Sequence, residues 1–185
     1  MLHIPPADLK RFMRNAFSKL GVPENDAEIC AEILISSDLR GIESHGVGRL
    51  RLYVDRIYDG LIEPVSIPVI KKESPTTAVV DGNHGIGMVI GHYANTLAIK
   101  KAKEFGMGSV AVRNSTHFGI DGYYPLMAVD AGMIGMSFTN ARPSVAPTFS
   151  VQPVLGTNPI AFGAPTDEDF PFLYDFIFTQ SKTSD

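Results

Sequence analysis

The chain has 185 residues, of which 16 are Lys or Arg and 20 are Asp or Glu, so its formal net charge at pH 7 is −4. Hydrophobic residues make up 44% and charged residues 19%, an ordinary globular composition that excludes an intrinsically disordered chain. A mildly acidic chain without a block of Lys and Arg has no electrostatic footprint for nucleic acid or an anionic membrane, so neither is expected as a partner.

The single cysteine, Cys30, excludes a disulfide within the chain and argues against a cysteine-based zinc site, so we expect no metal. The first residues show no charged segment followed by an apolar one, and no run of about 18 apolar residues occurs anywhere. The sequence therefore predicts neither a signal peptide nor a membrane span, and the cytoplasm is the expected compartment.

Apolar residues recur at helical intervals through the N-terminal third of the chain. They predict three helices, over residues 9–20, 24–39 and from near Ser44 to Tyr58. Gly21, Gly41 and Gly60 follow these segments, as glycine often does at helix ends.

The remainder alternates between extended and helical patterns. Prolines 64, 68 and 75 first divide the chain into short extended pieces. Strands are then predicted over 77–80, 109–112, 133–138, 159–163 and 170–175, and helices over 89–105 and 123–131. A strand–helix–strand–helix–strand order behind N-terminal helices predicts an α/β or α+β fold.

The densest group of chemically active residues lies around the start of the third predicted helix. His45, Arg49 and Tyr53 are four residues apart, so on a helix they share a face, and Arg56 follows. An imidazole exchanges protons near neutral pH, and an arginine binds a carboxylate with two parallel hydrogen bonds. Ser44 could orient the imidazole or relay its proton. The alternative is a solvated helix face that carries these residues without a function.

Two further groups lie in loops. His117 follows a predicted strand and precedes a helix, where α/β proteins often bind ligands, and it is a second candidate for proton transfer or for donating to a carbonyl. Thr157 and Asn158 could bind a cofactor amide or phosphate. The alternatives are a capped turn and a turn that enters a strand. Residues 82–87 fail the Gly-x-Gly-x-x-Gly spacing of Rossmann dinucleotide loops.

Taken together and in this order, four short motifs resemble the malate/L-lactate dehydrogenase-like oxidoreductases. This family includes ureidoglycolate and sulfolactate dehydrogenases and piperideine-2-carboxylate reductases. The motifs are SDLRGIESHGVGRL at 37–50, DGNHGIG at 81–87, VRNSTHFG at 112–119 and LGTNPI at 155–160.

The resemblance implies a non-Rossmann NAD(P)-binding fold with a mixed sheet, working as a homodimer. It implies hydride transfer between NAD or NADP and C2 of a small 2-hydroxy acid, 2-keto acid or 2-imino acid. Residues 1–75 would then form a helical part for substrate and dimer contacts, residues 76–178 the cofactor-binding part, and residues 179–185 a polar tail.

Position by position, the resemblance implies that Ser44 and His45 form a proton relay. Arg49 matches the residue for the substrate carboxylate, and Tyr53 is taken with it as substrate-binding. His117 matches a residue that is the acid/base in some members and lines the nicotinamide site in others. The expected cofactor-binding residues are Thr116, His117, Phe118, Gly119, Ile120, Thr157, Asn158 and Asp175. The choice between His45 and His117 as the acid/base, the choice between NAD and NADP, and the substrate stay open.

The length departs from the family, whose members are about twice as long. The sequence turns polar after residue 178 and stops at 185, so we expect a truncated chain. The alternative function is therefore a catalytically silent binding or assembly module with the same fold.

Overall fold

The computed structural model describes residues 4–177, and the chain divides into two compact units at Tyr123 and Tyr124. Mixed helices and small sheets place it in the α+β class, as predicted. The boundary predicted at residue 75 separates a substrate and dimer part from a cofactor-binding part rather than two compact units, and it stays a prediction. No helix in this described range has the length and apolarity needed to span a bilayer.

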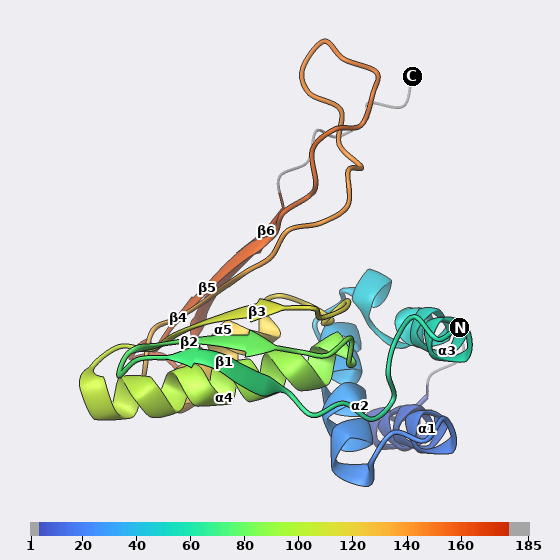
Figure 1. The fold of residues 1–185 in the computed structure, drawn as a ribbon, viewed down its shortest axis with the longest axis horizontal. Helices are drawn as coiled ribbons and strands as arrows, with labels where there is room; N and C mark the ends of the chain where they lie inside the picture. The colour runs from blue at the N-terminus through green and yellow to red at the C-terminus, as the bar shows by residue number, and fades with distance from the viewer. Residues whose placement is uncertain (1–3, 178–185) are drawn as a thin grey trace. The chain divides into compact units, whose positions relative to one another are not determined.

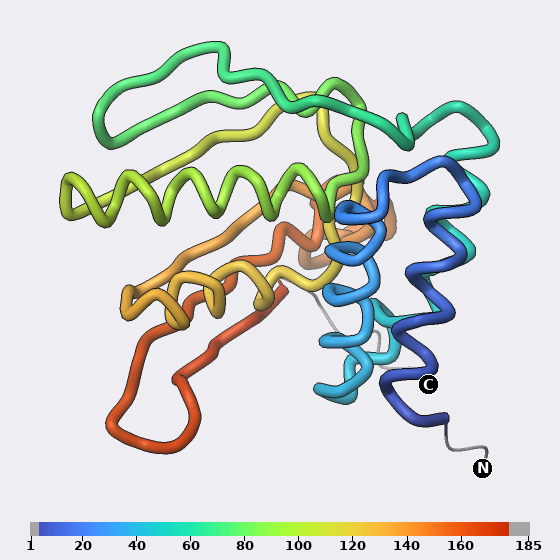
Figure 2. Tube along the Cα trace, turned by 90° about the horizontal axis from the view of Figure 1, so that it is seen from below, coloured from blue at the N-terminus to red at the C-terminus, as the bar shows by residue number. Residues whose placement is uncertain are grey.

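The first unit begins with two packed helices, α1 (Pro6–Lys19) and α2 (Glu24–Leu39), which Figure 2 shows side by side in blue. Met13 and Phe17 of α1 are fully buried, as are Ile33 and Leu34 of α2. Burial of such apolar side chains is the main stabilising contribution to this unit.

The third predicted helix begins later than the sequence indicated. Helix α3 covers Leu50–Tyr58, and residues 43–49 form two 3₁₀ turns instead. Gly46 separates these turns with a non-helical backbone (φ −90°, ψ −142°), and the Asp38 carboxylate occupies the space that a Cβ of Gly46 would fill. Because Val47 also donates its N–H to Asp38 Oδ2 (2.8 Å), a tertiary contact replaces the regular helix here.

A three-stranded sheet completes the first unit, with β1 (Val69–Glu73), β2 (Thr77–Asp81) and β3 (Ser109–Arg113) in that order (Figure 1). The sequence predicted only a short extended piece between Pro68 and Pro75 here, because the residues of β1 are mostly exposed and carry no apolar alternation. It pairs antiparallel to β2. Strand β3 pairs parallel to β2 after helix α4 (Gly87–Phe105), so the loops that follow β2 and β3 emerge at the same edge of the sheet.

The second unit contains α5 (Tyr123–Asp130) and an antiparallel sheet of β4 (Gly135–Phe138), β5 (Ile160–Ala164) and β6 (Phe172–Phe176). All four elements were predicted, with ends that differ by up to two residues. Gly135 and Gly163 lie on the face against α5, where a Cβ on either would crowd Pro125.

The opposite face of this sheet is apolar. Met136 pairs with Phe162, which pairs with Tyr174, so these three side chains share one face. Met136 and Tyr174 are 60% and 54% exposed.

Candidate functional site

The first two sequence clusters meet in the first unit. His45 comes from the 3₁₀ turns before α3, and His117 comes from the loop after β3. Their imidazole rings stack, with centroids 5.6 Å apart and planes inclined by 26°. The fold therefore brings together two proton-transfer candidates that are far apart in the sequence.

Ser44, His45 and Arg49 form one connected group. Ser44 Oγ lies 2.9 Å from His45 Nδ1, and Arg49 Nε donates to the Ser44 carbonyl oxygen at 2.6 Å. That bond uses only Nε, and a guanidinium has four further N–H groups. Ser44 is exposed and His45 half-buried. The group thus places a hydroxyl, an imidazole and a cation together at the surface.

Tyr53 joins the site from inside the core. The sequence placed it on one helix face with His45, but the helix does not extend that far, and Tyr53 is fully buried in α3. Its hydroxyl lies 2.6 Å from His117 Nδ1. Its ring packs edge-on against Phe17, with centroids 6.0 Å apart. Tyr53 therefore contacts His117 directly, and its predicted contact with substrate stays a prediction.

The contacts of His117 identify its tautomer. The backbone N–H of Gly119 points at Nδ1 (3.3 Å), and a backbone N–H can only donate. This contact favours a lone pair on Nδ1, in which case the Tyr53 hydroxyl, 2.6 Å away, donates to the same atom. In the neutral ring the proton consequently lies on Nε2.

Electrostatics keep this ring neutral. Burial lowers the pKa of His117 to about 4, with further lowering by His45, Arg49 and Arg56. Burial raises the pKa of Tyr53 above its ordinary value, which keeps its hydroxyl protonated and able to donate. At neutral pH, His117 is a hydrogen-bond donor through Nε2 rather than an imidazolium.

The loop that carries His117 is held by the loop after β2. Thr116 Oγ1 donates to the Gly85 carbonyl oxygen (3.0 Å) and accepts the Gly87 N–H (2.9 Å). A Cβ on Gly87 would overlap the carbonyl oxygens of Thr116 and His117. Sequence reasoning treated residues 82–87 as a failed dinucleotide motif and as part of a family motif, and it missed this supporting role.

Gly119 fixes the other side of the His117 loop. Its φ of +88° lies in the left-handed region, and the Ile33 side chain of α2 fills the place of its missing Cβ. Ile120 beside it is 4% exposed, and Phe118 is half-buried. Thr116, Phe118, Gly119 and Ile120 thus form one ordered segment around His117, and their predicted contacts with a cofactor stay predictions.

The remaining predicted residues lie in the second unit. Asn158 Oδ1 accepts the Ala141 N–H at 2.9 Å, and Thr157 precedes it, half-buried. Asp175 is exposed on β6 and pairs with Ala161. Ser44, His45, Arg49, Tyr53 and His117 all belong to the first unit, together with the segment 116–120 described above.

The sequence model of the malate/L-lactate dehydrogenase family matches residues 4–184. The malate dehydrogenase of Pyrococcus horikoshii is 51% identical over 174 residues, which cover 94% of this chain and 48% of that protein. The L-sulfolactate dehydrogenase of Methanocaldococcus jannaschii is 47% identical over 158 residues, covering 85% and 46%.

Solved structures agree with these matches. The malate dehydrogenase of Entamoeba histolytica superposes with a TM-score of 0.94 at 48% identity, covering 97% of this chain and 50% of that one. The Δ1-piperideine-2-carboxylate reductase of Pseudomonas syringae gives 0.86 at 28% identity, covering 95% and 53%. The chain spans about half the length of the relatives it matches. By its sequence and its fold, the chain belongs to the malate/L-lactate dehydrogenase family.

Proposed function

We propose that this chain carries the substrate-binding and proton-handling residues of an NAD(P)-dependent dehydrogenase. The reaction would transfer a hydride between a nicotinamide and C2 of a small 2-hydroxy or 2-keto acid. The observation that carries the proposal is the stacking of His45 on His117 beside Arg49. The relatives named malate and sulfolactate dehydrogenase support the substrate class.

Each residue has a role that follows from its contacts. Arg49 would bind the C1 carboxylate through the N–H groups that its bond to Ser44 does not use. His117 would donate from Nε2 to the C2 oxygen, since Nδ1 already accepts from Gly119 and Tyr53. The negative charge that grows on that oxygen during reduction is stabilised by such a donor.

The proton itself would pass through Ser44 and His45. Their side chains are hydrogen-bonded, and Ser44 is exposed, so the pair can exchange protons with water. A neutral His117 with a pKa of about 4 is a poor proton donor at pH 7. We therefore assign proton exchange to His45 and hydrogen-bond donation to His117.

The residues expected to hold NAD or NADP have suitable chemistry. Phe118 offers a partly exposed aromatic ring for the nicotinamide, while Thr157, Asn158 and Asp175 offer groups that hydrogen-bond amides and hydroxyls. The bound nicotinamide would supply or accept the hydride. The resemblance also implies a homodimer, which we include in the proposal together with the cytoplasm as the expected compartment, and analytical ultracentrifugation tests the dimer.

The purified chain tests the proposal directly. Binding of NADH and NADPH is followed by nicotinamide fluorescence, and turnover is then measured with oxaloacetate, pyruvate, glyoxylate and Δ1-piperideine-2-carboxylate. Saturable binding and oxidation of the cofactor by a keto acid are expected. Turnover of the cyclic imine alone would make the chain an imino acid reductase. A folded chain that binds neither cofactor would be the silent module.

Arg49→Ala is expected to raise KM for the acid by about 10- to 100-fold, because a hydrogen bond to a charged group contributes roughly 1.5–3 kcal/mol. Arg51→Ala is the matched control, since the Arg51 side chain is 89% exposed and pairs only loosely with Asp55 at 3.5 Å. KM is measured from initial rates for both variants. Equal KM values for Arg49→Ala and the parent chain would contradict the assignment.

A further inference from the structure

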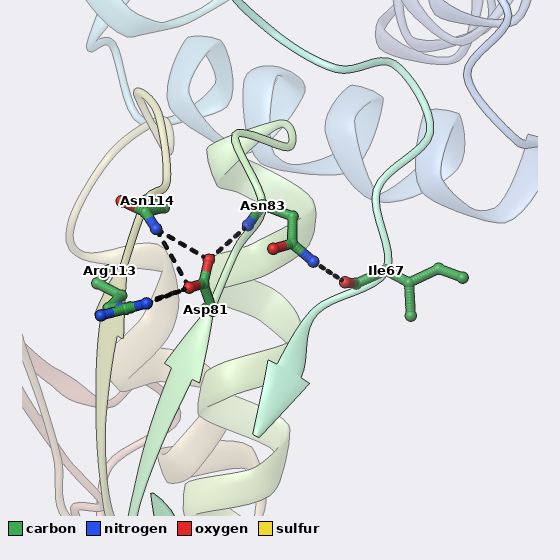
Figure 3. Close-up of polar contacts among 5 residues, drawn as sticks. All are labelled: Ile67, Asp81, Asn83, Arg113 and Asn114. Atoms are coloured by element: carbon green, nitrogen blue, oxygen red, sulfur yellow. Dashed lines mark hydrogen bonds and ion pairs between the residues drawn. The ribbon is translucent and has the colours of Figure 1, made fainter. Parts of the chain in front are cut away.

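Asp81 is a buried carboxylate at the end of β2, where the sheet leads into the two loops around His117. It is 3% exposed, and no step proposed above uses it. Figure 3 shows its side chain between the ends of β2 and β3, surrounded by hydrogen-bond donors. A buried carboxylate is stable only when its oxygens are well supplied with such donors.

Both loops supply those donors. Asp81 Oδ1 accepts the Asn83 N–H at 3.0 Å and the Asn114 side-chain amide at 3.1 Å. Oδ2 accepts Arg113 Nε and Nη2 at 2.9 and 2.8 Å and the same Asn114 amide at 3.1 Å. One carboxylate therefore contacts the first residues of the loop after β2 and of the loop after β3.

These contacts stabilise unusual backbone conformations. Asn83 and Asn114 have φ values of +46° and +50°, in the left-handed region that residues other than glycine rarely occupy. Each residue donates a hydrogen bond to Asp81. The hydrogen bonds to the carboxylate thus stabilise the left-handed turn that each loop makes after its strand.

From Asn114 the contacts continue to the site. The Asn114 carbonyl oxygen accepts the His84 N–H at 2.8 Å, so the two loops lie backbone to backbone. Two residues further on, Thr116 bonds to Gly85 and Gly87. His117 comes next, so its position depends on a series of contacts that begins at Asp81.

We propose that Asp81 is a positioning residue, which holds the loop after β3 through Arg113 and Asn114 so that Nδ1 of His117 meets Tyr53 and Gly119. Its effect on turnover rests on the function proposed above, but its effect on the His117 ring does not. The Asn83 N–H lowers the pKa of Asp81 most, and the Arg113 guanidinium and the Asn114 amide lower it further, to about 2. Asp81 therefore stays ionised at every working pH.

Asp81→Asn tests the proposal in the full chain. Asparagine has nearly the same shape as aspartate. Its side-chain N–H group would, however, face the N–H donors of Arg113 and Asn114, so those hydrogen bonds would be lost. The side-chain nitrogen signals of His117, measured by NMR between pH 3 and 8, report its tautomer and pKa. We expect the pKa to rise by at least one unit from about 4, because the ring loses its fixed, buried position. If the chain is a dehydrogenase, kcat should fall about tenfold.

Asp59→Asn is the control, because Asp59 is exposed at the end of α3. It should leave the His117 signals unchanged. Arg113→Lys keeps a cation beside Asp81 and should give a smaller shift than Asp81→Asn. Unchanged His117 signals in folded Asp81→Asn would overturn the proposal and leave Asp81 a purely structural residue.

A second variant covers the case in which Asp81→Asn does not fold. Asn114→Gly allows the same left-handed backbone but removes the amide that Asp81 accepts. It should shift the pKa of His117 in the same direction, and no shift would again overturn the proposal. Because these readouts need no substrate, they distinguish failure of this proposal from failure of the proposed function.

Discussion

His117→Ala is expected to lower kcat by about 10²–10³-fold, which is the usual loss when one donor to a developing oxyanion is removed. KM for the acid should change little, because Arg49 still binds the carboxylate. His117→Gln places an amide N–H near the position of Nε2 and should recover part of the lost rate. Steady-state rates of both variants, measured with the best keto acid, provide the test.

The pH dependence separates donation from proton transfer. The pKa of His117 is about 4, so the ring is neutral above that value and protonated only below it. Protonation would put a hydrogen on Nδ1, which would break its contact with the Gly119 N–H and reverse the direction of its hydrogen bond with the Tyr53 hydroxyl. Activity that depends on the neutral ring is therefore retained from pH 8 down to about 5 and is lost as the pH falls through about 4.

An inflection of kcat near pH 6.5 that disappears in His117→Ala would contradict this assignment. So would equal rates for the Gln and Ala variants. Tyr53→Phe serves as the matched control inside the site, because the Gly119 N–H still donates to Nδ1 and preserves the tautomer. We expect a loss of rate smaller than that of His117→Ala.

Gly87→Ala is expected to lower the free energy of unfolding by about 3 kcal/mol, at the upper end of the usual cost of overpacking. The new methyl group would overlap the carbonyl oxygens of Thr116 and His117. These are backbone atoms, so relief requires the whole loop to move. The helix propensity of alanine at the start of α4 offsets about 1 kcal/mol at most.

Gly48→Ala is the control for this substitution. The nearest atom to a Cβ there is the Glu43 carbonyl oxygen at 3.4 Å, which leaves room for a methyl group. Urea denaturation of the two variants and the parent chain gives the comparison. Stability of Gly87→Ala equal to that of Gly48→Ala would show that the two loops are not tightly packed in solution.

Local pattern was enough to predict most elements, because helices with apolar stripes and strands with turn residues at their ends follow from short stretches of sequence. The sequence did not identify β1 as a sheet strand, because its pairing with β2 defines it and its own residues show no apolar alternation. The predicted start of α3 was too early, because the Val47 N–H donates to the Asp38 carboxylate, a contact that sequence periodicity does not reveal.

The residues that the sequence singled out for the site do lie close together in the fold, but their contacts were not predicted. Proton chemistry singled out His45 and His117, and the fold stacks their rings. Tyr53, by contrast, was expected beside His45 and instead approaches His117 from the core. Asp81 and Phe17 were not identified, because their roles depend on contacts between segments that no local motif encodes.

The packing of Ile33 against Gly119 limits which substitutions the family fold can accept here. A larger residue at 119 would need a smaller side chain at 33 to make room for its Cβ. It would still be strained, because the backbone at 119 has a φ of +88°, which residues other than glycine rarely adopt. Compensating double substitutions are therefore ineffective at this pair. A saturation library at 119 should recover mainly glycine, whichever apolar residue stands at 33.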